Sequence, residues 1–135
     1  MGIHQLGSMM TKTINYFSIP EFEKDFKKLE KRYRTLSDDF ENMKKNLLEV
    51  HYIKGAPLPP NTIVDIEGLC GENYKSKKVR KFTCKSLRNL GNRSGIRVIF
   101  VLEPADLKIT FIEIYHKSDK TIENKERLKE FIKNL

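Results

Sequence analysis

A loop-forming segment near the middle of the chain separates two halves whose apolar residues follow different periods. Residues 54–61 hold one glycine and three prolines, a composition that neither a helix nor a central strand accommodates. Before this segment, apolar residues recur every three or four positions, as they do on one face of a helix. After it, they follow the alternation of strands. The chain is therefore predicted to have an α+β fold.

The first half predicts a short strand followed by a helical hairpin. Residues 14–19 form an apolar run that ends at Pro20, a residue suited to the first turn of a helix. One helix is expected from Pro20 with Ser18 as a nearby cap, and a second is expected to open at Ser37. Their apolar positions include Phe22, Phe26, Leu29, Tyr33, Phe40, Met43, Leu47 and Leu48.

The second half predicts strands and a terminal helix. Strands are expected over residues 79–87, 96–102 and 107–116, and residues 63–69 could add a short edge strand. A terminal helix capped by Ser118 or Asp119 follows. We therefore expect an antiparallel sheet of about four strands, with the helical hairpin packed on one face and a C-terminal helix.

The length of 135 residues fits one domain, which we expect to span residues 11–135. Residues 1–10 show no periodicity and are interpreted as an expression scar or a disordered start. No stretch is apolar enough to cross a membrane and no signal peptide is recognised, so we expect a cytoplasmic protein without a membrane partner. The two cysteines and three histidines lack metal-ligand spacing, so neither a metal nor a cofactor is expected.

The positive charge of the chain is concentrated in one segment. Residues 75–97 contain nine of the 26 basic residues and no acidic residue, whereas the rest of the chain carries 17 basic and 18 acidic residues. Such a local field attracts polyanions, of which nucleic acid is the commonest in a cytosol. A solvated basic loop is the alternative. The predicted RNA-binding residues are Lys75, Lys77, Lys78, Arg80, Arg88 and Arg93.

A second set of polar residues is predicted to share one face of the sheet. If the turn after Leu102 pairs that residue with Leu107, the face collects Lys81, Lys85, Arg97 and His116. A slip of one residue would replace His116 by Tyr115 and Lys117. Positive charge and a histidine suit RNA cleavage without a metal, because the phosphate needs charge stabilisation and the reaction needs proton transfer. Alternatively, His116 is an ordinary strand-end residue beside solvated lysines.

Three segments resemble the RelE/ParE superfamily of toxins from bacterial and archaeal type II toxin–antitoxin systems. They are residues 81–87, 94–101 and 111–117, the second of which begins Ser-Gly-Ile-Arg. The likeness covers roughly residues 14–135 and is nearer to the RelE branch than to the gyrase-poisoning ParE branch. It implies a small RNase-like fold in a single RelE-like toxin domain.

The resemblance also implies an activity, a set of catalytic residues and partners. The activity is a metal-independent endoribonuclease that cuts mRNA in the ribosomal A site by attack of the 2′-hydroxyl, arresting translation. Arg97 corresponds to the arginine of the Ser-Gly-x-Arg strand, and Lys81 and Lys85 to the strand lysines. Tyr115, His116 and Lys117 stand at the family's variable C-terminal cluster. The implied partners are mRNA, the ribosome and a cognate antitoxin that forms a hetero-oligomer. A non-catalytic RNA- or ribosome-binding module and a gyrase-directed toxin remain alternatives.

Overall fold

The computed structural model describes residues 12–135, and the segment interpreted as a scar or disordered start lies outside them. The strands are β1 (Asn15–Ser18), β2 (Ile63–Cys70), β3 (Lys75–Val79), β4 (Ile96–Glu103) and β5 (Lys108–His116). The helices are α2 (Pro20–Arg32), α3 (Leu36–Met43), α4 (Val50–Tyr52) and α5 (Lys125–Lys133). A wider π-helical stretch, Lys44–Glu49, joins α3 to α4, and short 3₁₀ helices span Lys85–Leu90 and Pro104–Asp106.

The five strands form one sheet in the order β1-β5-β4-β3-β2. β2, β3, β4 and β5 pair antiparallel, whereas β1 lies parallel to β5 at the edge. The α+β fold is confirmed, with five strands instead of about four and one parallel pair. Between β1 and β5 the chain forms α2, which packs against β5, and then the three strands β2, β3 and β4, so β1 and β5 are paired across a long connection.

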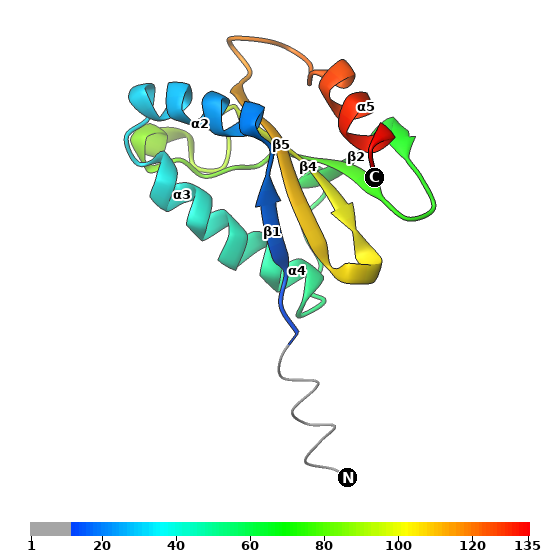
Figure 1. The fold of residues 1–135 in the computed structure, drawn as a ribbon. Helices are drawn as coiled ribbons and strands as arrows, with labels where there is room; N and C mark the ends of the chain where they lie inside the picture. The colour runs from blue at the N-terminus through cyan, green and yellow to red at the C-terminus, as the bar shows by residue number, and fades with distance from the viewer. Residues whose placement is uncertain (1–11) are drawn as a thin grey trace.

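Helices cover both faces of the sheet, as Figure 1 shows, with α2 and α3 on one side and α5 on the other. The hairpin face buries Val98, Phe100 and Leu102 of β4 against α2 and α3. The opposite face buries Ile99 and Val101 together with Leu128 of α5. β4 is therefore apolar on both faces, which explains its nearly unbroken run of apolar residues.

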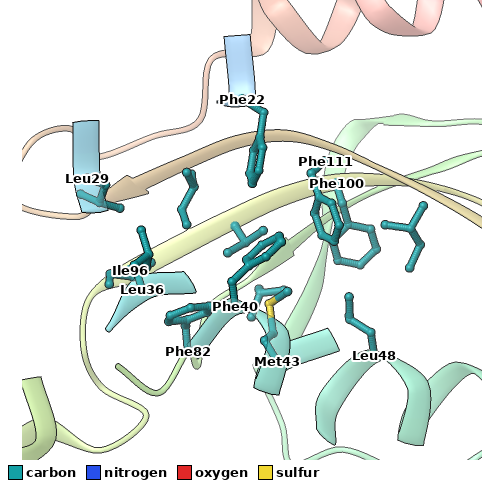
Figure 2. Close-up of a cluster of buried hydrophobic side chains, with 14 of the residues drawn as sticks. Phe22, Leu29, Leu36, Phe40, Met43, Leu48, Phe82, Ile96, Phe100 and Phe111 are labelled. Carbon is teal, nitrogen blue, oxygen red and sulfur yellow. The ribbon is translucent and has the colours of Figure 1, made fainter. Parts of the chain in front are cut away.

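The larger core is built around aromatic rings, which Figure 2 shows between the hairpin and the sheet. Phe40 packs against Phe111 with ring centroids 4.8 Å apart, and Phe22 lies 5.6 Å from Phe40 and 5.5 Å from Phe111. Each ring buried in this way contributes about 1.5–3 kcal/mol. Phe22, Phe26 and Leu29, whose spacing predicts α2, thus form the surface through which that helix contacts the core.

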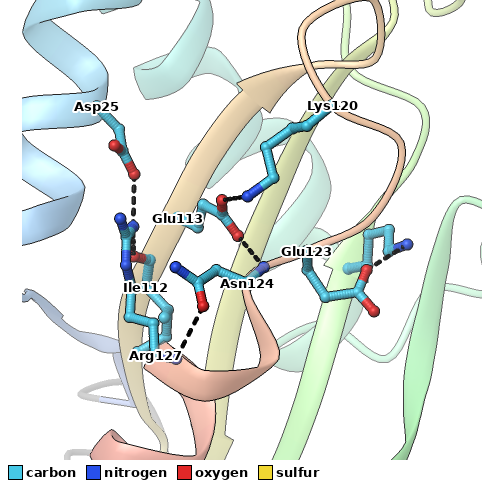
Figure 3. Close-up of polar contacts among 8 residues, drawn as sticks. Asp25, Ile112, Glu113, Lys120, Glu123, Asn124 and Arg127 are labelled. Atoms are coloured by element: carbon cyan, nitrogen blue, oxygen red, sulfur yellow. Dashed lines mark hydrogen bonds and ion pairs between the residues drawn. The ribbon is translucent and has the colours of Figure 1, made fainter.

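Polar contacts fasten α5 and the segment before it to the sheet (Figure 3). Glu113, 3% exposed, accepts from Nζ of Lys120 at 2.5 Å and from the amide of Asn124 at 2.7 Å. Arg127 donates to Asp25 of α2 at 2.6 Å and to the carbonyl of Ile112 at 3.0 Å. The carboxylate of Glu123 pairs with Lys78 at 2.6 Å. These contacts position α5 against both β5 and α2.

Four predictions of element boundaries or caps are wrong. α2 begins at Pro20 as expected, but its cap is Ile19 rather than Ser18, and no side chain of the described residues caps it. Residues 79–87 do not form a strand: β3 ends at Val79, and Phe82 and Cys84 are buried in an irregular segment instead. The cap of α3 is Thr35 rather than Ser37, and α5 is capped by Asn124, whose side chain accepts from the amide of Arg127. Within residues 12–135, no helix is long and apolar enough to traverse a bilayer.

Candidate nucleic-acid interface

A buried turn before β4 fixes one end of the sheet. The hydroxyl of Ser94, a residue 1% exposed, donates to the carbonyl of Phe82 at 2.5 Å. The same oxygen accepts from the amide of Ile96 at 3.2 Å. These two bonds hold the start of β4 against the irregular segment that follows β3, so the side chains on the two segments lie close together.

The ring of His116 packs directly against the backbone of Gly95, the residue that follows Ser94 in this turn. Gly95 has a φ of 87°, which favours glycine, and a Cβ there would lie 2.9 Å from Nε2 of His116. Nε2 donates to the carbonyl of Ser94 at 2.9 Å, and Nδ1 accepts from the amide of Ser118 at 3.0 Å. A carbonyl only accepts and an amide only donates, so these bonds define a neutral ring protonated on Nε2. The ring also stacks on Tyr33 with centroids 5.8 Å apart.

A hollow of about 270 Å³, which we call the basic hollow, lies beside this turn. Five of its lining residues are basic, two are asparagines, and none is acidic. They come from the ends of β3 and β4, the loop before β2, the turn before β4 and the segment after β5. The lining residues are Asn61, Arg80, Lys81, Asn92, Arg93, Gly95, Arg97 and Lys117.

Arg97 carries the partly buried charge of the basic hollow. Its guanidinium donates to the carbonyl of Arg80 at 2.7 Å. Burial, together with the charge of Arg80, lowers the pKa of Arg97, while Tyr115 acts in the opposite direction. Arginine stays charged under all ordinary conditions, so this site holds a cation in unfavourable surroundings. An anion bound in the hollow would relieve that cost.

In the described part of the chain, no carboxylate serves as a counterion for the basic side chains of the hollow. Within residues 12–135, none of Arg80, Lys81, Arg93, Arg97 or Lys117 forms an ion pair. Their charges are therefore available to a ligand.

The other basic residues of the segment 75–97 lie outside the basic hollow. Lys77 pairs with Asp65 at 2.5 Å and Lys78 with Glu123 at 2.6 Å, so both charges are already partnered. Lys75 lies at the opposite end of β3. Arg88 is exposed on the 3₁₀ helix, and Lys85 lines a separate hollow of about 310 Å³ that it shares with Lys81. The structure thus brings only part of residues 75–97 to the basic hollow.

The predicted register between β4 and β5 is wrong. Glu103 lies opposite Lys108, and a bulge between Ile99 and Phe100 shifts the pairing again toward the start of β4. Arg97 therefore lies opposite Tyr115, and His116 lies opposite Ile96 on the other face of the sheet. Tyr115 and Lys117 thus share a face with Arg97, as expected for a slip of one residue, although the pairing at Arg97 is shifted by three residues, from Ile112 to Tyr115. The face predicted to join Lys81, Lys85, Arg97 and His116 does not exist, because Lys85 stands on a 3₁₀ helix and His116 points to the hairpin.

Tyr115 and His116 do not line the basic hollow. Tyr115 is 6% exposed and packs in the core under α5. Burial, followed by the charges of Glu123 and Glu113, raises the pKa of Tyr115 to about 12. Its phenol therefore stays protonated at neutral pH. Since both ring nitrogens of His116 are engaged, neither residue offers a free proton acceptor to the hollow.

The arrangement can bind and stabilise an anion. Among residues 12–135, no three His, Cys, Asp or Glu side chains gather as a set of metal ligands. Two residues that line the basic hollow, Asn61 and Asn92, are not identified from the sequence, because an asparagine is neither charged nor a typical catalytic residue. The one sequence signal for Asn61 is its position after two prolines, which marks a turn.

No protein-family model matches the sequence, and no curated protein matches it. Two solved structures do match. A chain of the archaeal RelE–RelB complex from Pyrococcus horikoshii OT3 is 11% identical, with a TM-score of 0.49, and the match covers 81% of this chain and 100% of that one. A mutant of the E. coli toxin RelE in the free state is 17% identical, with a TM-score of 0.45, covering 92% of this chain and 99% of that one.

Proposed function

We propose that this protein is a RelE-like toxin that binds mRNA at the basic hollow and cleaves it as an endoribonuclease. The observation that carries the proposal is the gathering of five basic side chains, unpaired within residues 12–135, around a small hollow whose lining has no carboxylate. A phosphodiester is the complement of such a site, because its oxygens accept from arginine and lysine and its charge replaces the missing counterion. The resemblance of residues 94–101 to the family supplies the reaction.

In this proposal the arginine and the lysines have separate roles. The guanidinium of Arg97 binds the non-bridging phosphate oxygens and stabilises the charge that develops on the pentacovalent phosphate. The 2′-hydroxyl attacks phosphorus, the bond to the 5′-oxygen breaks, and a cyclic phosphate and a 5′-hydroxyl remain. Lys81 and Lys117 are the side chains available to transfer the two protons, one leaving the 2′-hydroxyl and one reaching the departing 5′-oxygen.

The same surface accounts for the proposed partners. An antitoxin segment rich in carboxylates would neutralise the charges of the basic hollow and exclude RNA from it. The toxin–antitoxin complex is then an inactive hetero-oligomer, and loss of the antitoxin exposes the hollow to mRNA on the ribosome.

A second candidate function is a non-catalytic module that binds RNA or the ribosome. The specific observation in its favour is the state of His116 and Tyr115, two of the residues that the sequence offers for proton transfer. His116 is locked between Ser94 and Ser118, and Tyr115 is buried with a raised pKa. Under this alternative the basic hollow holds phosphate but transfers no protons.

Cleavage of a defined mRNA in a reconstituted translation reaction separates the two candidates. The purified protein is added to translating ribosomes, and the mRNA 5′ ends are mapped by primer extension. We expect new ends with 5′-hydroxyl groups inside the coding region, and their loss in the Lys81→Ala/Lys117→Ala variant. Ribosome or RNA binding by the wild type without any new end would establish the non-catalytic module instead.

A further inference from the structure

Two of the residues that line the basic hollow have neutral side chains, which cannot contribute to neutralising the charge of a bound phosphate. Asn61 and Asn92 both line it, and neither side chain makes a hydrogen bond within residues 12–135. An amide differs from the surrounding ammonium and guanidinium groups because it both donates and accepts. Phosphate oxygens only accept, so an amide adds nothing that the five basic residues do not already offer to a phosphate.

Asn61 is held at a fixed place in the wall of the hollow. It occupies the third position of a turn in which the amide and the hydroxyl of Thr62 both donate to the carbonyl of Pro59, at 3.3 and 2.7 Å. The carbonyl of Pro60 accepts from Nζ of Lys81 at 2.8 Å. These bonds anchor the backbone on both sides of Asn61 and define the conformation from which its side chain extends.

The conformation of this turn does not by itself require asparagine. Asn61 has a φ of 64°, and a turn with proline second and a positive φ third accepts glycine with less strain than asparagine. What asparagine adds over glycine is the carboxamide. Asn61 is one of the residues that line the basic hollow, as are Lys81 and Arg97.

We propose that the carboxamide of Asn61 binds the base of a nucleotide whose phosphate is held in the basic hollow. This inference rests on the proposed function and adds to it the recognition of nucleotides in single-stranded RNA. Base edges present a donor next to an acceptor, which one carboxamide can satisfy with two bonds, whereas contacts to phosphate carry no information about the base. The site would then distinguish single-stranded RNA from other polyanions.

The experiment compares two probes of equal charge: a single-stranded RNA of about 12 nucleotides, and an abasic ribose-phosphate strand of the same length. The main variant, Asn61→Gly, keeps the turn and removes the carboxamide. Asn73→Gly makes the same change in the exposed β2–β3 turn and is the matched control. Asn61→Asp keeps the turn as well but adds a negative charge to the hollow.

We expect Asn61→Gly to weaken RNA binding about three- to tenfold and to leave binding of the abasic strand unchanged, as removal of one or two hydrogen bonds predicts. Asn73→Gly should leave both affinities unchanged, and Asn61→Asp should weaken both. An unchanged ratio of the two affinities in Asn61→Gly would overturn the inference, provided that thermal unfolding shows an intact fold.

A third variant, Arg97→Ala, separates this inference from the function on which it rests. If Arg97→Ala weakens binding of both probes while Asn61→Gly leaves their ratio unchanged, base recognition by Asn61 is wrong and the basic hollow remains the RNA site. If Arg97→Ala leaves both affinities unchanged, the basic hollow is not the RNA site and both proposals fail.

Discussion

At the scale of single residues, the Ser94–Arg97 segment contains two residues that stabilise the fold and one that belongs to the proposed binding site. Ser94 and Gly95 serve the fold, since one ties β4 to Phe82 and the other makes room for His116. Arg97 serves the site, since its charge is partly buried beside that of Arg80. Substitution of Arg97 is therefore expected to change activity, whereas substitution of Gly95 is expected to change the free energy of unfolding.

Arg97→Ala should abolish most of the activity while leaving the fold intact. The side chain is only half-buried, and its one hydrogen-bond partner within residues 12–135 is a carbonyl, so little packing is lost. Removal of a donor to a developing oxyanion typically costs about 10²- to 10³-fold in rate. Arg97→Lys should restore activity only partly, because a single ammonium does not form a bidentate contact. Cleavage rates in the reconstituted translation reaction test both variants, and an equal rate for all three proteins would contradict the assignment.

Gly95→Ala should destabilise the fold by about 2–4 kcal/mol, since it combines backbone strain with displacement of the His116 ring. Gly55→Ala is the matched control, because Gly55 also has a positive φ, of 72°, but no atom lies within 4 Å of the added Cβ. It should cost about 1–2 kcal/mol. Urea denaturation measures the free energy of unfolding of both variants. Equal losses would mean that contact with His116 contributes nothing.

At the scale of elements, β3 shows how a strand that is polar in sequence becomes central in the sheet. Three of its five residues are lysines, yet it pairs with both β2 and β4. Lys77 and Lys78 find carboxylates on opposite faces, Asp65 on β2 and Glu123 before α5. Because Glu123 is buried, its pair with Lys78 is expected to stabilise the attachment of α5.

The Lys78–Glu123 pair predicts a dependence of stability on pH. Burial acts to raise the pKa of Glu123, but the bond and charge of Lys78 outweigh it, and the net pKa lies below its ordinary value of 4.5. A carboxyl whose pKa is lower in the folded state stabilises the fold above the unfolded value and loses that contribution as the pH falls through the folded value. The pair should therefore stabilise fully at pH 7 and progressively less below about pH 4.5.

Lys78→Met tests this dependence by removing the partner of Glu123. It should cost about 1–3 kcal/mol at pH 7, and the difference from wild type should shrink below about pH 4.5 as Glu123 becomes neutral. Lys77→Met is the control, because its partner Asp65 is 58% exposed, and it should cost less than about 1 kcal/mol. Urea denaturation across the pH range is the measurement. A difference between Lys78→Met and wild type that stays constant with pH would refute the pairing.

The elements differ in how far the sequence predicts them. β4, β5 and α2 follow from local signals, namely runs of β-branched residues, and Pro20 ahead of an amphipathic repeat. β3 does not, because its lysines are satisfied by carboxylates distant in sequence. The alternation at Phe82 and Cys84 marks burial correctly but not a strand, since a loop tied to Ser94 also buries them.

The sequence also does not predict which residues of β4 and β5 pair with one another. A bulge at Ile99/Phe100 and the turn before Lys108 set this register, and neither has a clear sequence signature. The register decides which side chains accompany Arg97, so the composition of the site could be predicted only in part. Arg97, Lys81 and Lys117 line the hollow, whereas His116 and Tyr115 do not.

At the scale of the whole molecule, the chain carries a net charge of +8, and five of its basic residues line the basic hollow without an ion pair within residues 12–135. If each of the five basic residues of the hollow neutralises at most one phosphate, the logarithm of RNA affinity should fall against the logarithm of salt concentration with a slope no steeper than about −3.5. Arg97→Ala should reduce that slope by about 0.7. Fluorescence titration of RNA over a range of salt concentrations measures it, and an affinity independent of salt would exclude the hollow as the binding surface.

Induced expression with mapping of mRNA 5′ ends tests the central claim, that the basic hollow cleaves mRNA. Wild-type protein and Arg97→Ala are expressed to equal levels in the same cells, without an antitoxin. The wild type should arrest growth and produce new 5′ ends inside coding regions, and Arg97→Ala should do neither. Growth arrest without new mRNA ends, or equal toxicity of Arg97→Ala, would contradict the claim.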